Sequence, residues 1–232
     1  MRATLHLSLF TFFFYAFIAT FATTAWGAHG DADVHVSDAR TLTPQQAQRL
    51  SEWNGRVLIL RNLDSLSPAA AGNLANWQGD VLVFSRLSNL SPATAGSLSR
   101  WSGTTLAINE LEEFTPATAS SLARWQGDVL ELNGLSHLSP AAAGSLAQWS
   151  GFLLELNGLR ELTPATAGSL SQWRGRELEL NSLRKLTPAS AGALAQWRGQ
   201  YLELRGIVEL SPAARSSLSR WEGGHLLLGA PY

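Results

Sequence analysis

A single interval of 24 residues organises most of this 232-residue sequence. Tryptophan recurs at that interval eight times, at Trp53, Trp77, Trp101, Trp125, Trp149, Trp173, Trp197 and Trp221. A proline lies nine residues before each of these tryptophans, and a glycine lies two residues after it. An interval that is kept through eight copies without an insertion predicts a solenoid, because each unit must stack on an equivalent neighbour.

The repeat unit predicts one short helix and one strand. In the copy around Trp149, Ser139 precedes Pro140, which pairs a helix N-cap hydroxyl with a proline at the first helical position. We expect a helix of about ten residues after Pro140, with Gly151 as its C-terminal stop. The alternation of apolar and polar residues in VLELN, residues 129–133, predicts a half-buried strand.

The leucine spacing narrows the fold class further. The pattern LxLxxLxxL is formed by Leu130, Leu132, Leu135 and Leu138. The fuller motif, L-[ST]-P-A-x-A-x-x-L-[AS]-x-W-x-G-x-x-L-x-L, resembles the leucine-rich-like repeats of exported bacterial proteins, which are mostly uncharacterised. The resemblance covers about residues 33–228. At the position of Leu135, leucine-rich repeats carry an Asn or Cys whose buried side chain forms hydrogen bonds between adjacent turns. Because this chain has leucine there, we expect adjacent turns to be joined at that position by a row of apolar side chains.

These patterns together predict an α/β fold: a right-handed, curved solenoid with a parallel sheet on its concave face and short helices on its convex face. Strands stack about 4.8 Å apart whereas helices need about 8–10 Å, and this mismatch bends the stack. Counting strand copies from Asp33–Ser37 to His225–Gly229 gives nine strands and eight helices within residues 33–232. We expect the tryptophan row to pack in the core of this solenoid, in preference to forming a platform for carbohydrate.

The N-terminal segment is unlike the repeats. A basic Met1-Arg2 start is followed by an uncharged apolar run that ends in small residues near Gly27. This order predicts a signal peptide at residues 1–27, followed by a short linker at residues 28–32. An uncleaved membrane anchor is the alternative, because the run approaches the ~20 residues that span a bilayer. Under both interpretations the repeat domain is exported, which indicates a secreted or periplasmic location in a bacterial envelope.

The strand residues that point away from the core divide the sheet face into two zones. The early strands present an apolar patch, made of Val57, Ile59, Val81 and Val83. At the same 24-residue step, His35 is expected to lie beside Ile59. The later strands present glutamates flanked by asparagines and a tyrosine: Glu131, Glu155, Glu179, Glu203, Asn133, Asn157, Asn181 and Tyr201.

An exposed apolar patch usually marks a contact surface. The glutamate row allows three interpretations. It fits a basic peptide, or a weak calcium site that uses carboxylate and asparagine oxygens. It also fits solubilising side chains that were copied by repeat duplication.

The remaining motifs carry little chemistry. In HGDADVH, the alternating His29, Asp31, Asp33 and His35 would share one face of an extended segment and suit a transition metal. We interpret the segment instead as a flexible linker, and we assign no metal site and no cofactor. The sequence holds no cysteine, no hydrolase elbow, no zinc-protease motif and no nucleotide-binding loop, which predicts a protein that is not an enzyme. A net charge of -1 means that there is no excess of basic side chains to bind the phosphates of a nucleic acid.

Two functions follow as hypotheses. The first is an exported, non-enzymatic scaffold that binds a protein or peptide on the concave strand face, as solenoids commonly do. The second is a self-assembling structural protein of the cell envelope. This alternative rests on the apolar strand at LLLGAPY, residues 226–232, whose edge could pair with another copy.

Overall fold

A computed structural model describes residues 33–229 of the chain. Within this range, nine parallel strands form one sheet in sequence order, and eight helices alternate with them. The strands are β1 (Val34–Ser37), β2 (Val57–Leu60), β3 (Val81–Phe84), β4 (Thr105–Ile108), β5 (Val129–Glu131), β6 (Leu153–Glu155), β7 (Glu177–Glu179), β8 (Tyr201–Leu204) and β9 (His225–Leu228). The helices are α2 (Pro44–Ser51), α3 (Pro68–Leu74), α4 (Pro92–Leu98), α5 (Pro116–Leu122), α6 (Pro140–Leu146), α7 (Pro164–Leu170), α8 (Pro188–Leu194) and α9 (Pro212–Leu218).

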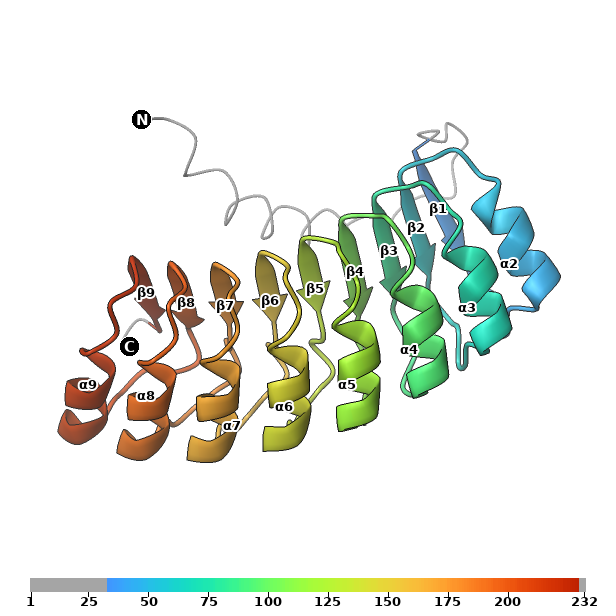
Figure 1. Cartoon of the computed structure of the whole chain (residues 1–232). Coiled ribbons are helices and arrows are strands. Elements are labelled where there is room, and N and C mark those ends of the chain that lie inside the picture. Colours follow the sequence, from blue (N-terminus) through green and yellow to red (C-terminus); the bar gives the residue numbers. More distant parts are fainter. Residues whose placement is uncertain (1–32, 230–232) are drawn as a thin grey trace. The chain divides into compact units, whose positions relative to one another are not determined.

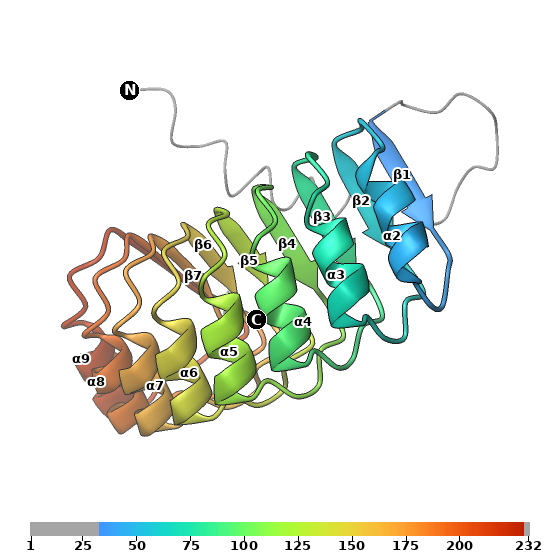
Figure 2. The ribbon, with the colours of Figure 1, turned by 45° about the vertical axis from the view of Figure 1, so that its right-hand side comes forward.

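The repeat array is the α/β solenoid that the sequence predicts. The strands lie side by side along one side of the array and the helices along the other (Figures 1 and 2). Each helix packs against the next helix along the chain, and each strand pairs with the next strand. The expected signal peptide at residues 1–27 and the linker at residues 28–32 lie outside the described residues.

The helices begin as expected and end earlier. In α6, the Ser139 hydroxyl accepts a hydrogen bond from the Ala142 amide at 3.1 Å, and Pro140 occupies the first turn. The helix has seven residues, with its C-cap at Ala147 in right-handed helical geometry. The expected length of ten residues is therefore wrong, because the residues before Trp149 form a separate tight turn.

The glycine after each tryptophan has a steric role. A Cβ atom on Gly151 would lie 1.9 Å from Cζ2 of Trp149, and the equivalent glycines meet their tryptophans in the same way. The indole ring therefore lies directly on the glycine backbone, and no side chain fits there. The expectation that Gly151 stops the helix is wrong, since α6 has already ended at Leu146.

The tryptophans form one continuous stack, buried along its length and partly exposed at its two end rings, Trp53 and Trp221. Neighbouring rings lie 5.8–6.0 Å apart between centroids, with interplanar angles of 2–11°. Trp77 donates its indole N–H to the carbonyl of Trp53 at 3.0 Å, and Trp173 does the same to Trp149. Together with the strand leucines, the stack fills the core between sheet and helices, as predicted.

Buried hydroxyls also tie neighbouring turns together. Thr94 donates to the carbonyl of Leu66 in the preceding turn at 3.1 Å, and Thr118 donates to Leu90 at the same distance. Thr166 and Ser190 repeat this contact further along the array. Each hydroxyl satisfies a carbonyl that would otherwise be buried without a partner.

The first strand departs from the 24-residue step. His35 pairs with Leu58 and Val36 pairs with Ile59, so β1 is displaced by one residue relative to the other strands. Because side chains alternate along a strand, this displacement turns every side chain of β1 to the opposite face. The expectation that His35 lies beside Ile59 is wrong. His35 faces inward and packs at 5.5 Å against the first ring of the stack, Trp53.

Candidate binding surface on the sheet face

The apolar patch lies at the N-terminal end of the sheet and is larger than predicted. Val57, Ile59 and Val81 are half-buried, as expected for a pleated face. Val83 is only 4% exposed, which corrects its assignment as an open contact residue. The displaced β1 adds Val34 and Val36, which are 40% and 39% exposed. The patch therefore extends to the edge strand β1.

The glutamate row is buried. Glu131, Glu155, Glu179 and Glu203 are 1–8% exposed although they point away from the core. They follow one another in register across β5 to β8, and side chains about 4.8 Å apart cover each other. This burial contradicts the interpretation that the glutamates only solubilise the surface. The structure adds a fifth buried carboxylate, Glu177, which is not among the residues predicted for the site.

A ladder of asparagine side chains runs beside the glutamates. The Oδ1 atom of Asn133 accepts the backbone N–H of Asn157 at 3.0 Å, and Asn157 accepts that of Asn181 at 2.9 Å. Asn181 in turn accepts the N–H of Arg205 at 3.0 Å. The expected row of apolar side chains is present, because Leu135 and its equivalents are fully buried. However, the turns are also joined by hydrogen bonds, which the sequence analysis did not predict.

The ladder fixes which end of each amide faces the glutamates. Because Oδ1 accepts from the backbone, the Nδ2 group of Asn157 points at the carboxylates and donates to Glu179 at 3.0 Å and to Glu155 at 3.3 Å. Asn181 donates in the same way to Glu179 at 3.2 Å and to Glu203 at 3.4 Å. The asparagine oxygens are therefore not free to bind calcium, which corrects that part of the calcium hypothesis.

Two arginines lie near the row. Arg205 donates from Nε to Oε2 of Glu203 at 2.8 Å. The guanidinium of Arg176 lies 5.0 Å from the centroid of the Phe152 ring, and it also donates to the side chain of Gln200. Arg205 thus pairs with one carboxylate of the row, and Arg176 binds groups beside it. Two cationic side chains therefore lie near five carboxylates.

Burial and mutual repulsion raise the pKa values of these carboxylates. Burial raises the pKa of Glu155 to about 9, with repulsion from Glu131 and Glu179 as further causes. Burial likewise raises the pKa of Glu177 to about 7, assisted by Glu179 and Glu203 and opposed in part by the charge of Arg176. The pKa of Glu179 is raised chiefly by burial and is lowered in part by the Asn157 donor. The row therefore favours protons, cations or cationic side chains.

The other predicted polar residues do not gather into a site. Within residues 33–229, His35 packs against Trp53, while Asp33 is exposed. His29 and Asp31 lie outside the described residues. Tyr201 is half-buried on the sheet face and its ring stacks on His225 at 4.8 Å, at the C-terminal end of the glutamate row.

Comparison with known proteins identifies the fold. No family model matches the chain, and no curated protein sequence matches it. Among solved structures, the chain is similar to the Toll–Spatzle complex of Drosophila, with a TM-score of 0.53 and 14% identity. That likeness covers 75% of this chain and 23% of the other.

Two further structures show weaker likeness. The leucine-rich repeat domain of APL1B has a TM-score of 0.47 and 15% identity, over 100% of this chain and 70% of that one. The TLR13–ssRNA13 complex has a TM-score of 0.42 and 18% identity, over 82% and 34%.

The fold and the likeness to the Toll–Spatzle complex define the class: the described residues form a solenoid of the leucine-rich-repeat type. The likeness to Toll extends to the fold alone, and the chain spans less than a quarter of that protein. The comparisons indicate no enzyme family. Among residues 33–229, no helix has the length and apolar character needed to cross a bilayer.

Proposed function

We propose that the chain is an exported, non-enzymatic repeat scaffold that binds a protein or peptide on the concave face of its sheet. The observation that carries this proposal is the chemical division of that face. One end presents partly exposed valines and isoleucine, and the other presents five buried carboxylates beside an asparagine ladder. The leucine-rich-repeat-type fold supports a binding role, because solenoids of this kind present extended concave surfaces.

The face has the dimensions of a peptide-binding groove. Nine strands in one sheet are separated by eight spacings of about 4.8 Å, which makes the face about 38 Å long. About eleven residues of extended chain cover that length at ~3.4 Å per residue. A partner that fits both zones carries apolar side chains over Val57 and Val81 and a Lys or Arg near Glu179.

A pair of matched variants tests the proposal. Val57→Arg combined with Val81→Arg places two charges on the apolar patch, where half-buried side chains can extend to solvent. Asn76→Arg combined with Gln148→Arg adds the same charge on the helix side, at exposed positions whose equivalents in other repeats include Arg124. Both proteins should give the circular dichroism spectrum of the wild type.

The two variants are then compared with the wild type by capture of partners from envelope extract. We expect a partner that the wild type and the helix-side variant retain and that the sheet-face variant loses. A partner retained equally by all three proteins would place binding elsewhere on the molecule.

Export is part of the same proposal. The basic start, the apolar run and the small residues near Gly27 support a signal peptide at residues 1–27 and a secreted or periplasmic location. The motif likeness to exported bacterial repeat proteins supports the same location. N-terminal sequencing of the chain recovered from the periplasm or medium should begin near Ala28. A chain that keeps Met1 and stays with the membrane would favour an uncleaved anchor.

Self-assembly is the second candidate function. It is favoured by the two edge strands, β1 and β9, which each pair with one neighbour only within the described residues. Leu226 of β9 aligns with the buried Leu202 but is 37% exposed, and Val208 nearby is 40% exposed. Light scattering should show concentration-dependent association that Leu226→Lys abolishes. A strict monomer at high concentration would remove this candidate.

A further inference from the structure

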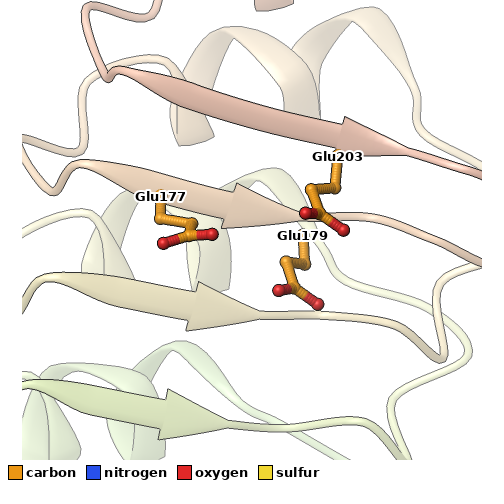
Figure 3. A group of neighbouring side chains, drawn as sticks. All are labelled: Glu177, Glu179 and Glu203. Carbon is orange, nitrogen blue, oxygen red and sulfur yellow. The ribbon is translucent and has the colours of Figure 1, made fainter. Parts of the chain in front are cut away.

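Three carboxylates of the glutamate row come together near the C-terminal end of the sheet. Glu177 and Glu179 lie on β7 and Glu203 lies on β8, and their side chains lie close together on the same side of the sheet (Figure 3). One oxygen from each can be chosen so that all three lie within 4.8 Å of one another. All three side chains belong to residues that are 4–8% exposed.

The separation of these oxygens matches a particular ion. Two oxygens bound to one Ca²⁺ at 2.3–2.6 Å are at most about 5 Å apart. Two oxygens bound to one Mg²⁺ at 2.0–2.1 Å are at most about 4.2 Å apart. Oxygens within 4.8 Å of one another fit around Ca²⁺ with little movement, whereas any pair at that limit would have to come closer to bind Mg²⁺.

The second observation concerns unused oxygen atoms in this cluster. Glu177 is 4% exposed, yet within residues 33–229 it forms no hydrogen bond and no ion pair. Outside the cluster, on β6 next to Glu179, Oε1 of Glu155 is fully buried and has no hydrogen-bond partner in that range. Buried carboxylate oxygens without a partner are costly, so they call for a proton or a cation.

The nearby cationic side chains do not fill this role. Arg205 is bound to Glu203. The charge of Arg176 stabilises the Glu177 carboxylate in part, but its N–H groups donate to Gln200 and its guanidinium lies over the Phe152 ring, so it forms no ion pair with Glu177. The asparagine amides donate to Oε2 of Glu179, which leaves its Oε1 for a ligand. Both oxygens of Glu203 accept hydrogen bonds from Arg205, so this carboxylate would bind an ion through the lone pairs that remain.

From this geometry we propose that Glu177, Glu179 and Glu203 form a Ca²⁺ site on the sheet face. Three monodentate or bidentate carboxylates supply three to six of the six to eight oxygens that Ca²⁺ takes, and water supplies the rest. Such a site belongs to the weak class, with a Kd of about 0.1–1 mM, as in extracellular calcium-binding modules. The site binds the ion without any protein partner, so it stands independently of the proposed scaffold function.

Calorimetric titration of the purified full chain with CaCl₂ at pH 8 tests the site. Wild-type protein should bind one Ca²⁺ per chain, and Mg²⁺ should bind at least fivefold more weakly. Glu177→Gln should weaken Ca²⁺ binding at least tenfold. This substitution keeps the shape of the side chain, removes one charge from the cluster and breaks no hydrogen bond of the described residues.

Glu131→Gln is the matched control, because Glu131 is buried in the same row but lies outside the cluster. Its affinity for Ca²⁺ should stay within twofold of the wild type. In thermal unfolding, 10 mM CaCl₂ should raise the midpoint of the wild type and of Glu131→Gln by several degrees, and should raise that of Glu177→Gln by clearly less.

Two results would overturn the proposal: no saturable binding of Ca²⁺ up to 10 mM, or equal binding by Glu177→Gln and the wild type. If Glu177→Gln does not fold, Glu203→Gln provides the same test, since it also removes one ligand of the cluster. A scaffold that captures a partner but binds no Ca²⁺ refutes the site alone. Ca²⁺ binding without any partner leaves the site standing and refutes the scaffold.

Discussion

Substitution of Asn157 tests the hydrogen-bonded ladder at its centre. In Asn157→Ala, the backbone N–H of Asn181 loses its acceptor, and Glu155 and Glu179 each lose a donor. An unsatisfied N–H costs about 1–3 kcal/mol, and each of the two lost side-chain hydrogen bonds contributes about 0.5–1.5 kcal/mol. Water reaches the half-buried Asn157 site and the carboxylates can protonate, so we expect a net loss of about 3–4 kcal/mol.

The assay is urea unfolding followed by circular dichroism, with amide hydrogen exchange as a local measurement. Exchange at the Asn181 amide should accelerate strongly, because that N–H has lost its acceptor. Asn89→Ala is the control: Asn89 is exposed, and its removal should change stability by less than about 0.5 kcal/mol. A loss below about 1 kcal/mol for Asn157→Ala, with unchanged exchange at Asn181, would refute a structural role for the ladder.

Three further predictions concern packing and charge. Gly175→Ala should lower the free energy of unfolding by about 1–3 kcal/mol, because its Cβ would lie 1.9 Å from Cζ2 of Trp173. Gly168→Ala in α7 meets nothing within 4 Å and should raise the free energy of unfolding by about 0.5–1 kcal/mol. Denaturant unfolding that ranks the two variants the other way would contradict the steric role of the glycine. Thr118→Val should cost about 1–2 kcal/mol by leaving the buried carbonyl of Leu90 without its donor, and an unchanged unfolding midpoint would refute that link. The folded-state pKa of Glu155 is raised to about 9 from an ordinary 4.5, so the stability that this side chain contributes is full below pH 4.5 and is lost as pH rises toward 9. The thermal midpoint, measured in EDTA, should therefore fall over that pH range, and it should fall less in Glu155→Gln. A midpoint that rises with pH would contradict this prediction.

The sequence predicts the architecture well because one interval controls every unit. Proline and the preceding hydroxyl residue fix each helix start, and the paired strand leucines fix which face is buried. The helix length could not be read correctly, since residues such as Ala147 and Gln148 suit a helix but enter the turn that places Trp149 on Gly151. The glycine was assigned the wrong role for the same reason.

The site was predicted only in part. Alternation shows which residues share the sheet face, but it does not show how deeply they are covered by neighbours, so Glu155 and Val83 were expected to be open. The displacement of β1 is invisible in the sequence because Pro44 and Trp53 keep the 24-residue step. Glu177 lies close to Glu203 although the two residues are not paired across the neighbouring strands β7 and β8. The 24-residue interval shows only which residues are paired, so it does not predict this contact.

Site-specific photo-cross-linking tests the central claim, that the concave sheet face is the binding surface, most directly. A benzophenone side chain is introduced at Val57 on the sheet face or at Asn76 on the helix side of the adjacent repeat. Each protein is irradiated in the cells that produce it, and adducts are resolved by gel electrophoresis and mass spectrometry. We predict an adduct with one partner from position 57 and none from position 76. Adducts from position 76 alone, or the same adduct from both positions, would contradict the assignment of the sheet face as the binding surface.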